Sequence, residues 1–442
     1  MEKVSGEWKR HANRKAPSYP SGSGDGRFCP RQVMALSRQG WRLVYAFKLD
    51  RLKHSMVCGH CNTPPDGEPS IAFALPAGLT NGGVTTWALA LSKRLNQKSH
   101  PSQLICHSAW PNRATFKSDD RSDVIYCDGL AWGAGIDAIR GFLPTYAAVK
   151  AKIFIPNWSW GTYGTVSFMS LNDCDIRVIA FAHSDQDHYY ELLTYYEPII
   201  SKFVGVSETI CQRLECLLPS RSNDICKLMY PVALLNESRQ PNHKKPLTIT
   251  YGGRIEQRQK RILDLIALTN LLASKKGNYH FKIAGDGPQL TQLIEHFEKK
   301  EYSNVSIEFL GLVAHERMTD LWASSDTSIL FSEFEGMSIS MLESMGQGCV
   351  PIVTDVSGAK EKITHGQTGF IVAVGDVASV AQILADLDAN RARVEQISNA
   401  CISSVRDHHR FDTYDRAFVK IMRECMSGPS AKWPGSKAIV PH

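Results

Sequence analysis

The 442-residue sequence lacks any apolar run close to the roughly 20 residues that a membrane-spanning helix needs. Its first residues, MEKVSGEWKRHANRK, contain no apolar stretch of the kind that defines a secretory signal. We therefore expect a cytoplasmic protein, with at most a peripheral contact at the cytoplasmic face of a membrane. Two nucleotide motifs are also missing. These are GxxxxGK[ST], which binds ATP phosphates, and GxGxxG after a strand, which binds NAD.

A disulfide framework of short, regular cysteine spacings is absent as well. The 12 cysteines are scattered, and Cys106 and Cys127 fall inside strand-like apolar runs, where a thiol packs as a small hydrophobic group. The sequence predicts free thiols in a reducing compartment. The segment HSMVCGHC at 54–61 contains residue types that bind zinc. A single CxxC without a second pair is weak evidence, and we expect no metal there.

Charge is concentrated at the start of the chain. Residues 1–68 contain twelve Lys/Arg and six Asp/Glu, which accounts for the whole net charge of +6. The remainder is formally neutral, so its charge gives no reason to expect nucleic-acid binding. Three interpretations of 1–68 stay open: a disordered extension, a leader translated from a start chosen too far upstream of Met56, or an interfacial amphipathic helix at 32–52.

From residue 69 the pattern is that of an α/β protein, and the length favours two domains. Short apolar runs alternate with helix-like stretches, as in parallel sheets with crossover helices. Strands are expected at 70–75, 104–107, 123–127, 152–156, 176–182 and 203–206, then at 247–251, 280–284, 306–310, 327–331, 350–354 and 370–372. A polar, proline-bearing linker is expected at 236–246, and apolar residues at helical spacing predict a helix at 262–272.

These patterns predict five segments. They are a basic, disordered extension at 1–68, a first domain at 69–240, a second domain at 241–410, a helix at 411–425 that packs back on the first domain, and a disordered tail at 426–442. Ligands of open α/β sheets bind beyond the carboxyl ends of the strands, so two such domains predict a cleft between them. The fold alone does not name the ligand.

Two carboxylates follow the expected strand at 327–331. Glu335 lies in the loop, Gly336 permits a close turn, and Glu343 lies on a helix expected to begin near Ser340. A helix N-terminus offers free N–H groups to an anion, one carboxylate can bind a ribose diol, and the other can reach sugar hydroxyls. If the two glutamates are considered without their neighbours, a simpler interpretation is favoured. Glu335 would then be a charge that stabilises a helix end, and Glu343 a solvated helix residue.

The residues that flank the two glutamates favour a binding role instead. Residues 332–363, SEFEGMSISMLESMGQGCVPIVTDVSGAKEKI, resemble the hallmark of glycosyltransferase family 4, a large group of retaining enzymes with the GT-B fold. The family pattern E-G-[FM]-x-x-x-x-x-E, followed by A/S-M-x-x-G-x-P-V/I, is matched at Glu335, Gly336, Met337, Glu343, Met345, Gly348, Pro351 and Ile352. The resemblance covers about 69–425 and is densest between 250 and 365.

This resemblance implies a fold and roles for the matched residues. The implied fold is α/β of GT-B type, with two Rossmann-like, doubly wound domains facing across a cleft and a C-terminal crossover helix. Glu335 would contact the donor sugar and Glu343 the ribose. Backbone N–H groups around Met337 and Ser338 would hold the sugar or a phosphate, next to Gly336.

The loop YGGRIEQRQKR at 251–261 supplies the expected cations. Cations fixed near a departing pyrophosphate stabilise the charge that develops on it, and Arg and Lys both bind phosphate oxygens. A solvated basic turn is the alternative, since Arg258 and Arg261 are also present. The resemblance selects Arg254 and Lys260, at a slightly looser spacing than in members with a simple E-K-G ending.

Three glycine-bearing loops would complete the donor site by the same resemblance. They are NGGV at 81–84, AGDGP at 284–288 and FLGLV at 309–313. Glycines let the backbone approach an anion closely, although each loop taken alone is more often a simple turn. The donor-binding residues expected in these loops are Gly82, Gly83, Gly285, Gly311 and Val313.

A further candidate is His183, which ends an apolar strand and is expected to be exposed at the carboxyl edge of the sheet. The usual interpretation is a hydrogen-bonded strand-end histidine, whereas the resemblance implies contact with the donor sugar. Asp185, Asp187 and His188 are candidates for the acceptor side. D-x-D pairs at 173–175 and 185–187 resemble metal-binding pairs of another transferase architecture. We expect no essential metal or cofactor, because Arg254 and Lys260 already supply positive charge.

Together these features predict a retaining hexosyltransferase that uses a nucleotide sugar and acts in polysaccharide or glycolipid biosynthesis. Its catalytic residues would be Glu335, Arg254, Lys260 and His183. The acceptor would be a glycan, a lipid-linked sugar or another hydroxyl, whereas the donor base, the sugar, the linkage and the oligomeric state are left open. The alternatives are a GT-B synthase or phosphorylase-like enzyme and a non-catalytic sugar-nucleotide-binding subunit. The intact set of Arg254, Glu335 and Glu343 favours a catalyst.

Overall fold

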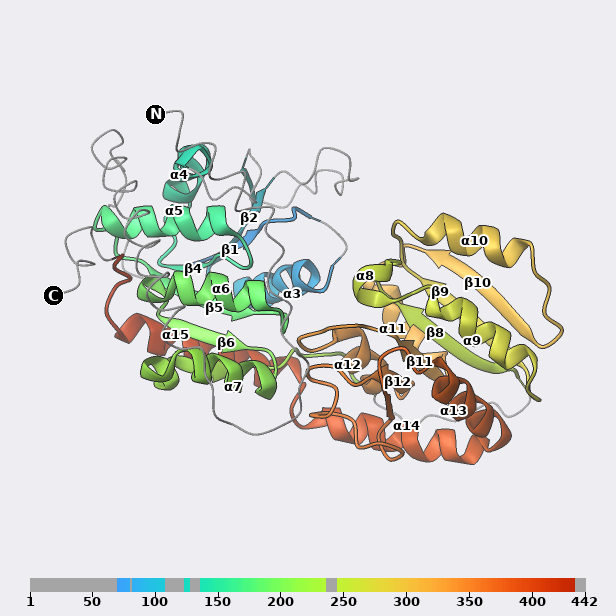
Figure 1. Ribbon diagram of the computed structural model, residues 1–442. Helices are drawn as coiled ribbons and strands as arrows, with labels where there is room; N and C mark the ends of the chain where they lie inside the picture. The colour runs from blue at the N-terminus through green and yellow to red at the C-terminus, as the bar shows by residue number, and fades with distance from the viewer. Residues whose placement is uncertain (1–69, 80–81, 108–122, 128–135, 236–244, 434–442) are drawn as a thin grey trace, which may run out of the picture. The chain divides into compact units, whose positions relative to one another are not determined.

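A computed structural model describes residues 70–79, 82–107, 123–127, 136–235 and 245–433 of the chain (Figure 1). The expected extension at 1–68 and its 54–61 segment lie outside the described residues, as does most of the expected linker at 236–246. Among the described helices, none is long and apolar enough to cross a membrane.

The first half of the described chain forms a parallel sheet in the order β3-β2-β1-β4-β5-β6-β7. Its strands are β1 (Ile71–Leu75), β2 (Ser102–His107), β3 (Val124–Cys127), β4 (Ile153–Ile155), β5 (Arg177–Ala182), β6 (Lys202–Gly205) and β7 (Ile225–Lys227). Six of them fall within two residues of an expected strand. The seventh, β7, was not expected, because three partly exposed residues do not form a recognisable apolar run.

Helices connect these strands, as parallel pairing requires. They are α3 (Gly83–Gln97), α4 (Ile136–Val149), α5 (Trp160–Leu171), α6 (Asp187–Tyr195) and α7 (Glu208–Leu217), with the 3-10 turns η1 (Glu197–Ile199) and η2 (Pro219–Asp224). Serine caps fix two of the starts. Ser159 Oγ accepts from the N–H of Thr162 at α5, and Ser207 Oγ accepts from the N–H of Ile210 at α7.

The second half forms a parallel sheet in the order β10-β9-β8-β11-β12-β13, and all six of its expected strands are present. The strands are β8 (Leu247–Gly252), β9 (Tyr279–Ala284), β10 (Val305–Gly311), β11 (Thr327–Leu330), β12 (Val350–Thr354) and β13 (Phe370–Val372). The helices are α8 (Gln257–Lys260), α9 (Asp264–Ala273), α10 (Leu290–Glu298), α11 (His315–Ala323), α12 (Ile339–Gly346), α13 (Val377–Ala389) and α14 (Arg391–Arg406).

The helix expected at 262–272 begins two residues later than the apolar spacing suggests. Arg261 has a left-handed backbone (φ 46°), which ends the short helix α8 and reorients the chain before α9. Ile262 is buried ahead of the helix, and Leu265, Leu268 and Leu272 form its buried stripe. The apolar spacing identified this face in part, because it had selected Ile266, which is only partly buried, in place of Leu268.

The last helix, α15 (Phe411–Ser427), packs against elements of the first sheet, beside which Figure 1 draws it at the red end of the colour scale. Its Phe418 ring stacks on Phe73 of β1 with 6.3 Å between centroids. Trp87 of α3 donates its indole N–H to the Tyr414 hydroxyl at 2.7 Å. The far end of the chain thus supplies part of the core around β1.

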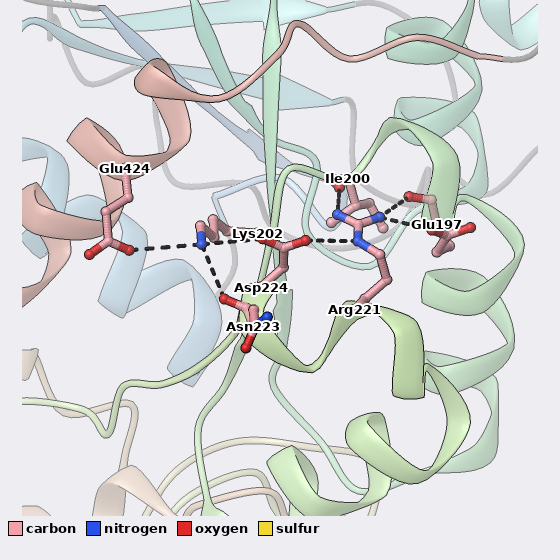
Figure 2. Close-up of polar contacts among 7 residues, drawn as sticks. All are labelled: Glu197, Ile200, Lys202, Arg221, Asn223, Asp224 and Glu424. Atoms are coloured by element: carbon pink, nitrogen blue, oxygen red, sulfur yellow. Dashed lines mark hydrogen bonds and ion pairs between the residues drawn. The ribbon is translucent and has the colours of Figure 1, made fainter.

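A group of charged residues links α15 to the 3-10 turns beside β6 (Figure 2). Lys202 lies 3.3 Å from a carboxylate oxygen of Asp224 and 3.8 Å from one of Glu424 on α15. Arg221 donates to the other oxygen of Asp224 at 2.8 Å and to the Glu197 carboxylate at 2.8 Å. Alternating charges in this cluster leave neither cation without a counter-charge.

Two expectations from the sequence are wrong in part. The tail expected to be disordered from residue 426 is ordered through 433, because Trp433 is buried and the N–H of Ala431 donates to the Ile176 carbonyl at 2.9 Å. Free thiols were expected throughout, yet Cys174 is disulfide-bonded, whereas the other eight described cysteines form no disulfide.

Candidate active site

The strand order of the second sheet explains where its polar loops meet. The chain proceeds outward from β8 to β9 and β10, then returns to place β11 on the other side of β8. At such a switch point the loops that follow the two neighbouring strands diverge and open a crevice at the carboxyl edge. The segment after β8 contains Arg254, in a loop, and Lys260, the last residue of α8, and the loop after β11 contains Glu335. The topology therefore joins groups that are 75 or more residues apart.

Lys260 and Glu335 form the central contact of this crevice. Nζ of Lys260 lies 2.5 Å from Oε1 of Glu335, and both side chains are largely buried, at 15% and 11% exposure. Ser332 Oγ donates to the same carboxylate oxygen at 2.8 Å, while Thr354 Oγ1 donates to the Ser332 carbonyl at 2.6 Å. The carboxylate is thus held in place by a cation and a hydroxyl.

The expected second cation, Arg254, lies in the same loop with an exposed side chain. Its guanidinium donates to the amide oxygen of Gln259, and its carbonyl accepts from the Tyr251 hydroxyl at 2.5 Å. The other basic residues differ from it. Arg261 is engaged by Asp264 and Glu333, which raise its pKa, and Arg258 is exposed on α8.

The AGDGP loop packs directly on the Arg254 loop, which explains its glycines. A Cβ on Gly285, which has φ +148°, would lie 1.9 Å from the Gly253 carbonyl oxygen. A Cβ on Gly287 would lie 2.3 Å from the Ile255 carbonyl oxygen. Backbone bonds then join the two loops, since the N–H of Ile255 donates to the Asp286 carbonyl at 2.9 Å. These glycines are required for loop contact.

The next loop contains Gly311 and Val313. Gly311 ends β10 in a left-handed conformation (φ +64°), and its carbonyl accepts from the N–H of Gly285 at 2.7 Å. Val313 is half-buried, whereas the neighbouring Leu312 is 59% exposed. The two expected donor loops after β9 and β10 are therefore adjacent.

Helix α12 begins at the expected anion-binding position. Ser338 is its N-cap, and its hydroxyl accepts from the N–H of Met341 at 3.3 Å. Met337 is buried in the core, so only its backbone can face a ligand. Gly336 is in tight contact with the first sheet, because a Cβ there would lie 2.3 Å from the His183 carbonyl oxygen.

Glu343 lies in the second turn of α12. Its side chain is 18% exposed, and Oε1 lies 3.6 Å from Nδ1 of His315 at the start of α11. Burial raises the pKa of Glu343, and the neighbouring His315 opposes the rise. Glu343 lines a hollow together with Trp87 and Trp322, whereas Glu335 lines a separate hollow with Ser338. The structure thus places the two carboxylates in separate hollows, and their roles toward one donor stay a prediction.

The glycine pair of the first half reaches the same helix. Gly82 is the N-cap of α3 with an extended backbone, and Gly83 is the first residue of the helix. A Cβ on Gly83 would lie 3.1 Å from Cδ1 of Ile339, the first residue of α12. Small residues at this point allow the starts of α3 and α12 to approach each other.

The expectation that His183 is exposed is wrong. The residue is only 7% exposed, because Tyr230 donates its hydroxyl to Nδ1 at 2.6 Å and Asn157 Oδ1 accepts from Nε2 at 3.1 Å. Asn157 Nδ2 donates to the Ala74 carbonyl, so its oxygen must be the acceptor and Nε2 carries the proton. Burial lowers the pKa of His183 to about 3, which keeps the ring neutral.

Carboxylates of both D-x-D pairs are engaged by cations. Arg213 of α7 contacts both Asp185, at 3.1 Å, and Asp187. Asp175 lies 2.8 Å from Lys152 and 2.6 Å from Arg177. Among the residues that the structure describes, no group of three or more His, Cys, Asp or Glu side chains could hold a metal ion.

Comparison with known proteins finds relatives of the part of the chain that contains these residues. A family model described as glycosyl transferases group 1 matches residues 235–403, the part that contains both cations and both carboxylates. This part of the chain is therefore similar to group 1 glycosyltransferases. Its loops after β8 and β11 thus belong to the matched region.

Curated relatives share modest sequence identity with this chain. N-acetyl-alpha-D-glucosaminyl L-malate synthase of Bacillus anthracis is 29% identical over 150 residues, 33% of this chain and 39% of that protein. The phosphatidylinositol N-acetylglucosaminyltransferase gpi3 subunit of Schizosaccharomyces pombe is 27% identical over 311 residues, 65% of this chain and 66% of that protein. The chain spans less than half the length of the first curated relatives it matches.

Solved structures of similar fold cover most of the chain. Anabaena HepE in complex with UDP-glucose covers 80% of this chain and 100% of its own, with a TM-score of 0.65 and 13% identity. The lipopolysaccharide outer core galactosyltransferase WaaB covers 80% and 99%, with a TM-score of 0.60 and 17% identity. The fold is GT-B, which confirms the prediction from the sequence.

Sequence reasoning missed several residues that organise the candidate site. Ser332 and Gln259 hold the two key side chains, and Asn157 and Tyr230 hold His183. A single serine or glutamine has no spacing pattern, so no signal was available for the first two. Asn157, His183 and Tyr230 lie in three separate loops. They meet only in the folded sheet, so the sequence does not show their contact.

An aromatic group lies at the carboxyl edge of β4 and β5. Trp158 stacks on Tyr189 with 5.8 Å between centroids and makes an edge contact with His188 at 4.7 Å. Burial lowers the pKa of His188, and Arg258 lowers it further. His188, expected on the acceptor side, therefore belongs to an aromatic cluster near the basic loop. Its contact with an acceptor stays a prediction.

Proposed function

We propose that the protein is a retaining glycosyltransferase that moves a hexose-type sugar from a nucleotide-sugar donor to a hydroxyl of a glycan or lipid-linked acceptor. We place it in polysaccharide or glycolipid biosynthesis, in the cytoplasm, with peripheral membrane contact when the acceptor is lipid-linked. Names of the relatives support this proposal, since they include transferases of N-acetylated sugars to lipid-linked acceptors in Campylobacter jejuni and to phosphatidylinositol in Schizosaccharomyces pombe.

The observation that carries the proposal is the pairing of Lys260 with Glu335, with Arg254 in the same loop. A sugar nucleotide presents hydroxyls beside a pyrophosphate, and the crevice presents a carboxylate beside two cations. Carboxylates accept hydrogen bonds from hydroxyls, and cations stabilise the charge that forms on a departing phosphate. We assign Glu335 to the sugar, Arg254 and Lys260 to the pyrophosphate, and Glu343 to the ribose.

The proposed reaction proceeds on one face of the sugar. The bond between the anomeric carbon and the phosphate oxygen breaks, and the acceptor oxygen bonds to the same carbon from the same face. The acceptor proton passes to the departing phosphate oxygen. In this scheme Glu335 orients the sugar, and Lys260 and Arg254 stabilise the nucleoside diphosphate that leaves.

We further propose that no metal is essential. The contact of Arg213 with both Asp185 and Asp187 supports this, because those carboxylates already have a counter-charge. Purified protein treated with EDTA should keep its transfer rate. A rate that falls more than tenfold and returns with Mg²⁺ or Mn²⁺ would contradict the proposal.

A binding panel and a variant together test the function. A sugar nucleotide at a hundred times its Kd should stabilise the folded protein by about 2.7 kcal/mol, so UDP-, GDP-, ADP- and CMP-sugars are compared by thermal unfolding. The best donor is then assayed for transfer with wild type and Glu335→Gln. A flat panel would contradict donor binding, and an unchanged transfer rate in the variant would contradict the role of Glu335.

Two alternative functions predict different results in the same assays. A phosphorylase-like enzyme would release or consume a sugar phosphate, whereas a synthase would interconvert a nucleotide sugar and its nucleoside diphosphate. Relatives named glycogen synthase in Mycobacterium tuberculosis keep the synthase in view. A non-catalytic subunit would bind donor without turnover. Product analysis by mass separates the three outcomes.

A further inference from the structure

Gln259 makes two hydrogen bonds to the loop after β11 and one to Arg254 in its own segment after β8. Its amide oxygen accepts from the Arg254 guanidinium, and its amide nitrogen donates to the Phe334 carbonyl at 3.2 Å. Its backbone carbonyl accepts from the N–H of Glu333 at 2.7 Å. We propose that Gln259 is a positioning residue that fixes Arg254 against the loop after β11. This loop contains Glu335, and we call it the donor loop.

The need for such a residue follows from the exposure of Arg254. Its backbone is fixed by the hydroxyl of Tyr251, but its side chain extends into solvent. Within the described part of the chain, the guanidinium makes its only side-chain hydrogen bond to Gln259. An arginine free to sample many rotamers would lose that freedom on binding a phosphate, at a cost in affinity. Gln259 removes part of this cost in advance.

Only an amide side chain provides both contacts. Its oxygen accepts from a cation, and its nitrogen donates to a carbonyl. A glutamate would leave the Phe334 carbonyl facing a second acceptor, and a lysine would face Arg254 with like charge. Methionine has a similar shape but makes neither strong hydrogen bond, so it is the informative replacement.

The residue next to Gln259 also contacts the loop after β11. Gln259 binds Glu333 and Phe334, and the next residue, Lys260, binds Glu335. Two successive residues of α8 thus hold three successive residues of the donor loop. The position of the pyrophosphate cation is thereby coupled to the position of the sugar carboxylate.

This inference rests on the proposed function, in which Arg254 contacts the pyrophosphate. Fixing Arg254 should affect the phosphate part of the ligand and leave the nucleoside part unchanged. A residue that merely maintained the fold would change both. Comparing a nucleoside diphosphate with its nucleoside therefore separates positioning from a structural role.

The experiment compares Gln259→Met with Gln382→Met in the full-length protein. Gln382 lies on α13, away from this crevice, where its side chain also accepts from a cation (Lys275, 2.7 Å) and donates to an oxygen (Asp386, 2.8 Å). Affinity for the best nucleoside diphosphate of the panel, for its nucleoside, and kcat/KM for transfer are measured. Gln259→Met should lose roughly 10- to 100-fold in diphosphate affinity and kcat/KM, the size of one hydrogen bond to a charged group.

Nucleoside affinity should stay within twofold in both variants, and Gln382→Met should match wild type throughout. A double-mutant cycle with Arg254→Lys completes the test, since a residue that acts through Arg254 should add little once Arg254 is changed. Additive losses, or an unchanged diphosphate affinity in Gln259→Met, would contradict the positioning role of Gln259 but not the proposed function. Wild-type behaviour of Arg254→Lys would overturn the assigned role of Arg254 and the inference with it.

Discussion

Lys260 and Glu335 neutralise each other across the crevice, with 2.5 Å between Nζ and Oε1. One residue comes from the loop after β8 and the other from the loop after β11, so the pair exists because these strands are neighbours. Both are proposed to contact the donor, at its pyrophosphate and its sugar. Donor binding must therefore redistribute the hydrogen bonds of the pair, and changing either residue should affect activity and stability differently.

Glu335→Gln should abolish most activity with little loss of stability. The amide can still accept from Ser332, but it no longer provides the negative charge that orients sugar hydroxyls beside Lys260. We expect kcat to fall by about 10²- to 10³-fold, comparable with the loss of a preorganised polar group in other active sites. Transfer assays and thermal unfolding check this, and a fall confined to stability would contradict it.

Lys260→Met should lower stability by about 1–3 kcal/mol, because it leaves the largely buried Glu335 carboxylate without its counter-charge. The double variant Lys260→Met/Glu335→Gln removes both charges and should recover most of that stability without recovering activity. Urea unfolding measures the first effect, and the transfer assay measures the second. If the double variant is as unstable as Lys260→Met, the ion pair is not the cause.

Gly285→Ala should disrupt the donor loops. The added Cβ would lie 1.9 Å from the Gly253 oxygen in a backbone conformation (φ +148°) that alanine rarely adopts. We expect a loss of about 2–4 kcal/mol in unfolding free energy and weaker nucleotide binding. Gly428→Ala is the control, since its nearest contact would be an ordinary 3.6 Å and its backbone is extended. Equal stability of the two variants would refute the steric explanation.

Stability should fall on acidification because three histidines are buried. Burial lowers the pKa of His183 to about 3 and those of His107 and His409 to about 4. The unfolded chain binds these protons near pH 6.5 and the folded chain does not. The stabilisation is therefore complete above about pH 6.5 and is lost as the pH falls from there toward 3–4. Each histidine contributes about 1 kcal/mol per pH unit within this window.

His409→Asn isolates one of these contributions. His409 lies outside the proposed donor site, and an asparagine amide can replace its 2.6 Å hydrogen bond to the Tyr230 carbonyl. Between pH 6.5 and 5, the variant should lose stability less steeply than wild type, by about one third. Urea unfolding at several pH values gives the slopes. Identical slopes would show that His409 does not titrate between the two states.

Arg221 should be important for the packing of the turns beside β6. It bonds the carboxylates of Glu197 and Asp224 and the carbonyl of Ile200, and its guanidinium lies 5.3 Å from the Phe203 ring centroid. Arg221→Met should cost about 1–3 kcal/mol of unfolding free energy by leaving these partners unsatisfied. Lys420→Met, which removes an exposed contact to Glu424, should cause no measurable change.

The strands and the loop that follows β11 could be predicted from the sequence because they depend on local pattern. Parallel buried strands appear as short apolar runs, and the E-G-M…E segment has a fixed spacing. The error at His183 has a physical cause. A strand-end position suggests exposure, but Tyr230, 47 residues further on, covers the ring. The tail at 428–433 was misjudged for a similar reason, since Pro and Gly content does not show that Trp433 is buried.

Gln259 shows the same limit within the site. The basic loop was recognised as a whole, and Arg254 and Lys260 were selected from it by resemblance. The glutamine between the arginine and the lysine has no pattern of its own, because its partners Phe334 and Glu333 lie more than 70 residues away. Contacts of this kind depend on which strands are adjacent in the sheet.

The position of α15 also has a consequence during synthesis. Phe418 and Tyr414 pack on Phe73 and Trp87, so the core around β1 is completed by a helix whose Tyr414 is synthesised 327 residues after Trp87. Until then, these apolar side chains of the first sheet lack part of their cover. Translation that stalls before residue 411 would release a chain with this surface open, a substrate for chaperones and proteases and a nucleus for aggregation.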